Sequence, residues 1–132
     1  MSDPELTTFQ ANQRYIKEGD GWRLGWDGNA PDFQGLLGGK GWAIELTALE
    51  FQEFCRLAQQ LAQTMQAMAS ELMDEERITC EAESDLIWLE VEGFPTAYSL
   101  RFILHGGRRC EGQWDESAVA GIVPAITRLT LF

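Results

Sequence analysis

The residues around Thr47 most strongly constrain the fold, because they predict the start of an unusually long helix. Thr47 and Glu50 have the spacing of a capping box. In this motif the Thr47 hydroxyl accepts from the Glu50 backbone N–H, and the Glu50 carboxylate accepts from the Thr47 N–H. Leu46 and Phe51 flank the cap with the spacing of a hydrophobic staple. The motif therefore marks the end of one β-rich segment and the beginning of a helix.

An apolar stripe extends this helix from residue 48 to about residue 74. Its members recur at alternating spacings of three and four residues: Phe51, Phe54, Ala58, Leu61, Met65, Met68 and Leu72. At about 1.5 Å per residue the helix is roughly 40 Å long, which exceeds what one small sheet can cover. It must therefore cover a wide sheet, two sheets or a neighbouring chain.

Alternation of apolar and polar residues predicts β-strands on both sides of the helix. Before it, three strands are expected over 21–27, 33–37 and 42–46, with a glycine-rich hairpin loop at 38–41. After it, a four-stranded meander is expected over 77–83, 86–92, 97–105 and 109–114. A second helix is expected over 116–129, capped by Asp115 or Ser117 and kinked or divided by Pro124. The predicted fold class is α+β, in the order three strands, helix, four strands, helix.

The two sheet-plus-helix units are expected to form a single domain over residues 1–132. A chain of 132 residues with 45% hydrophobic content suits one core. Residues 1–13 are polar and aperiodic, and we expect them to be a loose or peripherally docked arm. Residues 14–75 are expected to hold the first sheet and the long helix, and residues 76–132 the meander and the C-terminal helix.

The net charge of −11 indicates which partners the protein favours. Such a field attracts basic partners and repels phosphates and anionic lipid headgroups. Nucleic acid is therefore a possible but disfavoured partner, and no membrane partner is expected. The acidic start of the sequence has no apolar h-region, and no apolar run is long enough to span a bilayer. We expect a cytoplasmic protein that is a monomer or a weak homo-oligomer.

The sequence contains no pattern that predicts catalysis, a cofactor or a bound metal. The segment Gly38-Gly39-Lys40 lacks the spacing of a Walker loop and leads into a strand rather than a helix. A zinc site would have to combine the only histidine, His105, with three cysteines distant in sequence: Cys55, Cys80 and Cys110. Buried free thiols in a reducing cytosol are the favoured interpretation of this odd number of cysteines. We expect a non-enzymatic protein.

The outward positions of the meander form the one surface that the sequence singles out. Their paired carboxylates indicate a solvated face, because acid–base chemistry needs a concave and partly dry pocket. Trp88 lies among them and is either a contact residue or covered by the N-terminal arm. We predict an interaction or regulatory protein that binds an unidentified protein partner through acidic surfaces. The candidate contact residues are Glu81, Glu83, Trp88, Glu90, Glu92 and Arg101.

Four segments resemble a family of small cyanobacterial proteins of unknown function. They are GWRLGW at 21–26, GWAIELT at 41–47, ELMDEERITCEAES at 71–84 and YSLRFIL at 98–104. The resemblance implies a fold like that of the Whirly proteins and related single-stranded-DNA-binding transcriptional regulators, in which two units pair as a pseudo-dimer and each helix packs across the other unit. It adds single-stranded DNA or RNA binding as an alternative function. The acidic sheet departs from the basic groove that this activity needs, and fold kinship alone does not establish function.

Overall fold

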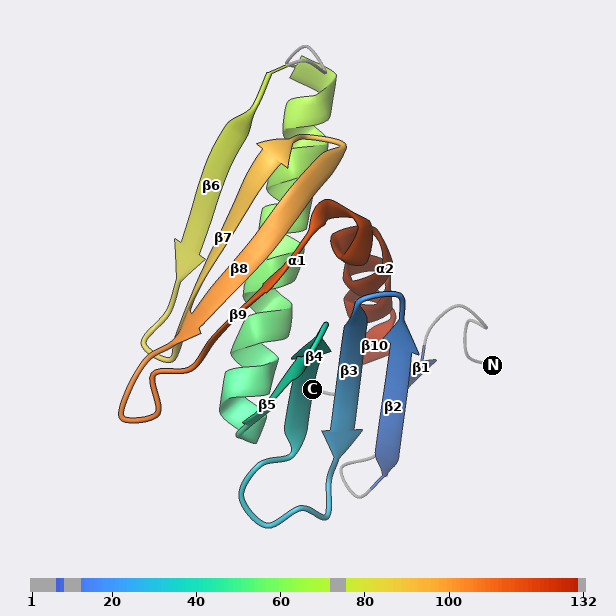
Figure 1. Ribbon diagram of the computed structural model, residues 1–132, viewed down its shortest axis with the longest axis vertical. Helices are drawn as coiled ribbons and strands as arrows, with labels where there is room; N and C mark the ends of the chain where they lie inside the picture. Colours follow the sequence, from blue (N-terminus) through green and yellow to red (C-terminus); the bar gives the residue numbers. More distant parts are fainter. Residues whose placement is uncertain (1–6, 9–12, 72–75, 131–132) are drawn as a thin grey trace.

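The computed structural model describes residues 7–8, 13–71 and 76–130, and it confirms the α+β class. The described residues form two four-stranded antiparallel sheets, two helices and a short two-stranded ribbon, arranged as in Figure 1. Apart from the ribbon strands β1 and β10 at either end, the described elements follow the order four strands, helix, four strands, helix. The prediction of three strands in the first unit was therefore wrong by one strand.

The first sheet has the strand order β2-β3-β4-β5. Its strands are β2 (Arg14–Gly19), β3 (Trp22–Asp27), β4 (Gly35–Gly39) and β5 (Trp42–Leu46). The strand that sequence patterning missed is β2, whose residues are almost all exposed. Because neither of its faces is fully buried, it carries no apolar alternation. The strand predicted at 33–37 begins later, since the Gln34 side chain is held in the preceding loop by the Ala30 carbonyl at 2.8 Å.

Two hairpins of this sheet share the pattern Gly-x-Gly-Trp, at 19–22 and 39–42. The second glycine of each turn has a positive φ, +82° at Gly21 and +78° at Gly41, which disfavours other residues there. The first glycine of each pattern lies under the tryptophan ring. A Cβ atom at Gly19 would lie 2.4 Å from Trp22 Nε1, and the corresponding distance for the second hairpin is 2.3 Å. The repeated pattern thus marks two turns of the same construction.

The helix α1 (Ala48–Glu71) begins at the predicted capping box. The Thr47 N–H donates to Glu50 Oε1 at 2.8 Å, and the Glu50 N–H donates to Thr47 Oγ1 at 3.2 Å. Leu46 and Phe51, the predicted staple, are both fully buried. The predicted extension to residue 74 falls partly on 72–75, which lie outside the described residues.

The length of α1 is explained by its contacts with both sheets. It packs on β4 and β5 of the first sheet and on β6 and β7 of the second. In Figure 1 it runs behind the second sheet and reaches the end of the first. Of the three arrangements that the apolar stripe left open, the structure shows the one in which a single helix covers two sheets.

The second sheet has the strand order β6-β7-β8-β9, which confirms the predicted meander. Its strands are β6 (Ile78–Glu83), β7 (Ile87–Phe94), β8 (Ala97–Leu104) and β9 (Glu111–Trp114). Most apolar residues of these strands face the helices and most polar residues face away, with Trp88 and Ile103 as apolar side chains on the outer face. This register fixes which side chains share the outer face.

The second helix, α2 (Glu116–Thr127), is capped by Asp115 rather than Ser117. The Asp115 carboxylate accepts from the Ala118 N–H at 2.9 Å, and the Ser117 hydroxyl donates to it at 2.8 Å. These bonds, the Ala118 one foremost, lower the pKa of the Asp115 carboxyl. The helix continues through Pro124 and is not divided there. It packs against β2 and β3 as well as β8 and β9, so α2 also contacts both sheets.

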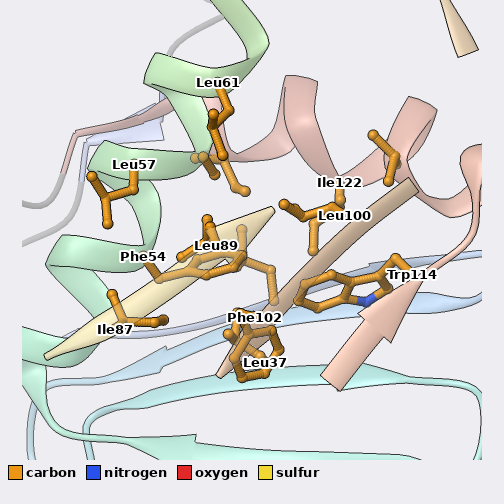
Figure 2. Close-up of a cluster of buried hydrophobic side chains, with 14 of the residues drawn as sticks. Leu37, Phe54, Leu57, Leu61, Ile87, Leu89, Leu100, Phe102, Trp114 and Ile122 are labelled. Carbon is orange, nitrogen blue, oxygen red and sulfur yellow. The ribbon is translucent and has the colours of Figure 1, made fainter. Parts of the chain in front are cut away.

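The hydrophobic core lies between the helices and the two sheets. Figure 2 shows side chains from α1, α2, β4 and the second sheet converging on one cluster. Within it the rings of Phe54, Phe102 and Trp114 pack on one another, and the partly buried Trp42 packs against them, with centroids 5.3 to 6.0 Å apart in five contacts. The two sheets therefore share a single core.

The described part of the expected N-terminal arm is not entirely loose. β1 (Thr7–Thr8) pairs in parallel with β10 (Leu129–Thr130), so residues 7–8 lie beside residues 129–130. The rest of the arm, residues 1–6 and 9–12, lies outside the described residues. Neither helix combines the length and apolar character that a membrane crossing requires, within the part of the chain described.

Candidate interaction surface

The outer face of the second sheet brings all six predicted contact residues together. We call it the acidic face and define it by the outward side chains of β6 to β9. In Figure 1 this face lies opposite the side covered by α1. Its members are Thr79, Glu81, Glu83, Trp88, Glu90, Glu92, Ser99, Arg101, Ile103, Glu111 and Gln113.

Trp88 lies on the inner strand β7 of the acidic face, opposite Glu83 of β6, and is held by two neighbours. Its Nε1–H donates to Glu81 Oε2 at 3.0 Å. The Arg101 guanidinium carbon lies 5.0 Å from the centroid of the Trp88 ring, a cation–π distance. Ile103 is its cross-strand neighbour on β8. Trp88 is thus half-buried and fixed in orientation, with an arginine stacked on it.

The register of β6 and β7 places two carboxylates directly opposite each other, Glu81 and Glu90. Like charges in this position destabilise a sheet. Arg101, the partner of Glu90 across β7 and β8, approaches Glu90 to 3.6 Å and offsets part of this repulsion. Its Nε atom is buried and has no hydrogen-bond partner among the described residues. The centre of the face therefore carries a local energetic cost.

Two further pairs of polar side chains lie toward the edges of the acidic face. His105 Nε2 lies 2.7 Å from Glu83 Oε2. Arg77 binds both carboxylate oxygens of Glu92, at 2.7 and 2.8 Å, and its guanidinium stacks on Phe94 at 5.1 Å. Arg77, Ile103 and His105 were not among the predicted contact residues. Strict alternation along 97–105 would have placed Ile103 and His105 on the same face as Arg101.

A hollow of about 430 Å³ extends the acidic face toward the start of α2. Its lining residues come from the position just before β6, from β7 to β9, and from the cap and first turn of α2: Arg77, Glu92, Gly93, Ser99, Gln113, Asp115, Glu116 and Ser117. Three of the four charged groups here are carboxylates. The hollow therefore adds negative charge at one end of a surface that already carries an excess of glutamate.

The three cysteines are free thiols and lie away from this surface. Burial raises the pKa of the Cys55 thiol to about 12, so it is protonated and unreactive at neutral pH. In the described part of the chain, no three His, Cys, Asp or Glu side chains are grouped so that they could hold a metal ion.

The fold and this surface define an α+β protein with two sheets, one of which presents an open acidic face. The chain belongs to the family described as a domain of unknown function, DUF1818, which it matches over residues 17–129. The predicted membership of a family of unknown function is thus confirmed.

A solved structure from Prochlorococcus sp. NATL2A is similar to this chain. It is a crystal structure at 1.80 Å resolution of a protein with unknown function from the DUF155 family. The two chains are 30% identical, with a TM-score of 0.82, and the match covers 87% of this chain and 97% of that one. No curated protein matches the chain.

Proposed function

We propose that this protein is a non-enzymatic, cytoplasmic interaction or regulatory protein, and that it binds a basic protein partner through the acidic face. The observation that carries the proposal is the Trp88–Arg101 stack on the two inner strands of an open sheet face, among glutamates. Tryptophan and arginine are the residues that most often dominate binding energy, and a polar rim around them is the usual anatomy of an interface.

The local energetic cost on the acidic face supports the same proposal. Glu81 and Glu90 oppose each other, and Arg101 Nε is buried without a hydrogen-bond partner among the described residues. Proteins commonly tolerate such violations of packing rules at functional sites. A lysine or arginine side chain from a partner would relieve the repulsion between the two glutamates, so binding would recover this cost.

The chemistry of the surface specifies a basic segment as the partner. The glutamates on the face outnumber its arginines, and the hollow beside Glu92 and Glu116 suits a cationic side chain. Charge complementarity of this kind raises the association rate and makes binding sensitive to salt. Apolar contact with Trp88 and Ile103 would supply the part of the affinity that salt does not screen.

A charge reversal on the acidic face is expected to remove partner binding. With a partner recovered from lysate and then purified, the Glu90→Lys/Glu92→Lys variant should bind at least about tenfold more weakly than the wild type. The matched control, Asp20→Lys/Asp32→Lys, changes the net charge equally at exposed positions of the first unit and should bind within about threefold of the wild type. Calorimetric titration at two salt concentrations measures the affinity of both variants for the partner. Equal losses in the two variants, or no reproducible partner, would contradict the proposal.

A Whirly-like pairing of the two units is the finer structural proposal. The contacts of α1 with β6 and β7, and of α2 with β2 and β3, support it, because each helix then packs on the sheet of the other unit. This arrangement makes single-stranded DNA or RNA binding the second candidate function. The glutamates of the acidic face count against it, since this binding needs a positive groove lined by aromatic side chains.

An oligonucleotide titration separates the two candidates. We expect no change in tryptophan fluorescence when single-stranded DNA or RNA is added to micromolar protein at about 50 mM salt, where phosphate contacts are near their strongest. A saturable change would favour nucleic-acid binding. The variant Arg14→Ala/Arg23→Ala, which removes two exposed cations of the first sheet, would then show whether that sheet holds the strand.

A further inference from the structure

The strand β2 forms an edge of the first sheet. It pairs with β3 on one side, and no strand among the described residues pairs with its other side. Its central residue, Ile16, is 51% exposed, and only one other large hydrophobic residue in the described chain, Leu49, is comparably exposed. An exposed edge with an apolar centre is a template for pairing with another strand.

The backbone hydrogen bonds between β2 and β3 show which residues of β2 direct their N–H and C=O groups to the open edge. The Gln13 carbonyl accepts from the Gly28 N–H at 3.0 Å, so position 13 bonds toward β3. Along an antiparallel strand the backbone N–H and C=O groups of successive residues point to opposite sides. The backbone groups of positions 15, 17 and 19 therefore also bond toward β3. The backbone N–H and C=O groups of Arg14, Ile16 and Glu18 therefore point to the open edge. The side chains of these same three residues share the outer face of the first sheet.

Arg14, Ile16 and Glu18 of one copy are complementary to the same three residues of a second copy when the two β2 strands pair antiparallel. With a two-fold axis at Ile16, Arg14 lies opposite Glu18 of a second copy, Glu18 lies opposite the second Arg14, and the two Ile16 side chains meet. All three are hydrogen-bonded pairs, because every residue involved directs its backbone to the open edge. Opposite charges directly across two strands stabilise a sheet.

Only this symmetric register pairs opposite charges across the two strands and also pairs the backbone N–H and C=O groups of the open edges. A two-fold axis at Arg14 would oppose two arginines, and an axis at Glu18 would oppose two glutamates, which costs stability in each case. An axis at Tyr15 or Lys17 would place Arg14 or Glu18 opposite Ile16 and leave the charge without its partner. The register is thus set by the sequence of the strand itself.

We propose that β2 pairs antiparallel with β2 of a second copy of this chain, so that the two first sheets form one continuous eight-stranded sheet. The apolar positions support this occupant. Ile16 lies opposite Gly25, and Gly25 lies opposite Leu36, so an apolar strip crosses the outer face from β4 to the edge. The two-fold axis joins this strip to its copy. The interface is small, and the dimer is weak, with a dissociation constant of about 10 to 100 µM.

The charged pairs of this interface form without a large desolvation penalty. Glu18 already binds Arg23 at 3.2 Å, and the two side chains are 64% and 48% exposed. Glu18 can accept a second guanidinium group on its open side. The acidic face lies on the other sheet, so partner binding and self-association use separate surfaces.

Sedimentation equilibrium of charge-reversal variants tests the register. The wild type should rise from its monomer mass of 14.9 kDa toward twice that value as concentration increases. Arg14→Glu alone and Glu18→Arg alone should each weaken self-association at least about tenfold, because each opposes like charges twice in the symmetric pair. An equimolar mixture of the two variants should regain wild-type association, since one copy then carries two glutamates and the other two arginines.

The variant Ile16→Pro tests the backbone part of the pairing. Proline lacks the backbone N–H that Ile16 directs to the open edge. The hydrogen bonds between β2 and β3 are therefore retained, while the hydrogen bonds between the two β2 strands of the dimer are lost. Arg56→Glu, an exposed charge reversal on α1, should dimerise as the wild type does, and far-UV circular dichroism establishes that each variant is folded. A wild type that stays monomeric at about 1 mM, a dimer that survives Ile16→Pro, or a mixture that does not regain association would overturn the proposal. If Ile16→Pro does not fold, the mixing experiment decides alone.

Discussion

Replacing Trp114 with alanine is expected to lower the free energy of unfolding by about 4 kcal/mol, the range for deleting a large buried aromatic side chain. Trp114 is 1% exposed. Its ring lies 5.3 Å from Trp42, 5.6 Å from Phe54 and 5.4 Å from Phe102, between centroids. The substitution would leave a cavity where the two sheets and α1 meet (Figure 2). Urea unfolding followed by far-UV circular dichroism measures the change.

Trp114→Phe separates packing from hydrogen bonding at the same position. The Trp114 Nε1–H donates to the Gly38 carbonyl at 2.9 Å, a buried bond between the second sheet and the first. Phenylalanine keeps much of the packing but leaves that carbonyl without its donor, so we expect a loss of about 2 kcal/mol. The half-buried Trp88 provides the control, and Trp88→Ala should cost about 1 kcal/mol or less. Trp114→Ala within about 1 kcal/mol of the wild type would show that the shared core is not the main source of stability.

Replacing Glu50 with alanine is expected to lower the free energy of unfolding by about 3 kcal/mol. Glu50 is only 8% exposed, and its Oε1 accepts both the Thr47 N–H and the Arg108 guanidinium. Arg108 also donates to the Glu45 carbonyl at 2.6 Å and stacks on Phe33 at 4.6 Å. Deleting the carboxylate removes a helix cap and strands a partly buried cation. Because the Arg108 side chain is still 34% exposed, the loss stays below that for a fully buried pair.

A double-mutant cycle measures the coupling free energy between Glu50 and Arg108. Combining Glu50→Ala with Arg108→Met should give a coupling energy of about 1 to 2 kcal/mol in chemical denaturation. The exposed pair Glu53–Arg56 on the same helix is the matched control, and its cycle should give about 0.5 kcal/mol or less. Equal coupling energies for the two pairs would contradict the role assigned to burial.

Local sequence patterns predicted most of the helix and strand positions. The capping box at Thr47 predicted the start of α1 correctly, because both of its hydrogen bonds form within four residues and need no distant partner. The alternation in the second half predicted four strands and, through them, the outer positions of Trp88 and Arg101. The role of these side chains as partner contacts stays a prediction.

Local sequence patterns did not predict the parts of the structure that depend on residues distant in the sequence. β2 has no buried face, so its sequence carries no periodic signal, and the repeated Gly-x-Gly-Trp turn was the available sign that a strand precedes Trp22. Arg108 lies in a loop whose sequence indicates only a turn. Its contacts with Glu45 and Glu50 span about 60 residues of chain and could not be read from spacing.

The sequence by itself determined the α+β class, the start of the long helix and the meander, because hydrogen bonds and side-chain alternation within a few residues specify them. The tertiary structure decided what the long helix covers, which strand forms the open edge and how Glu81, Trp88, Glu90 and Arg101 meet on one face. The physical reason is the range of the interactions. Capping and alternation act between near neighbours, whereas burial, cross-strand register and ion pairs join residues that only the folded chain brings together.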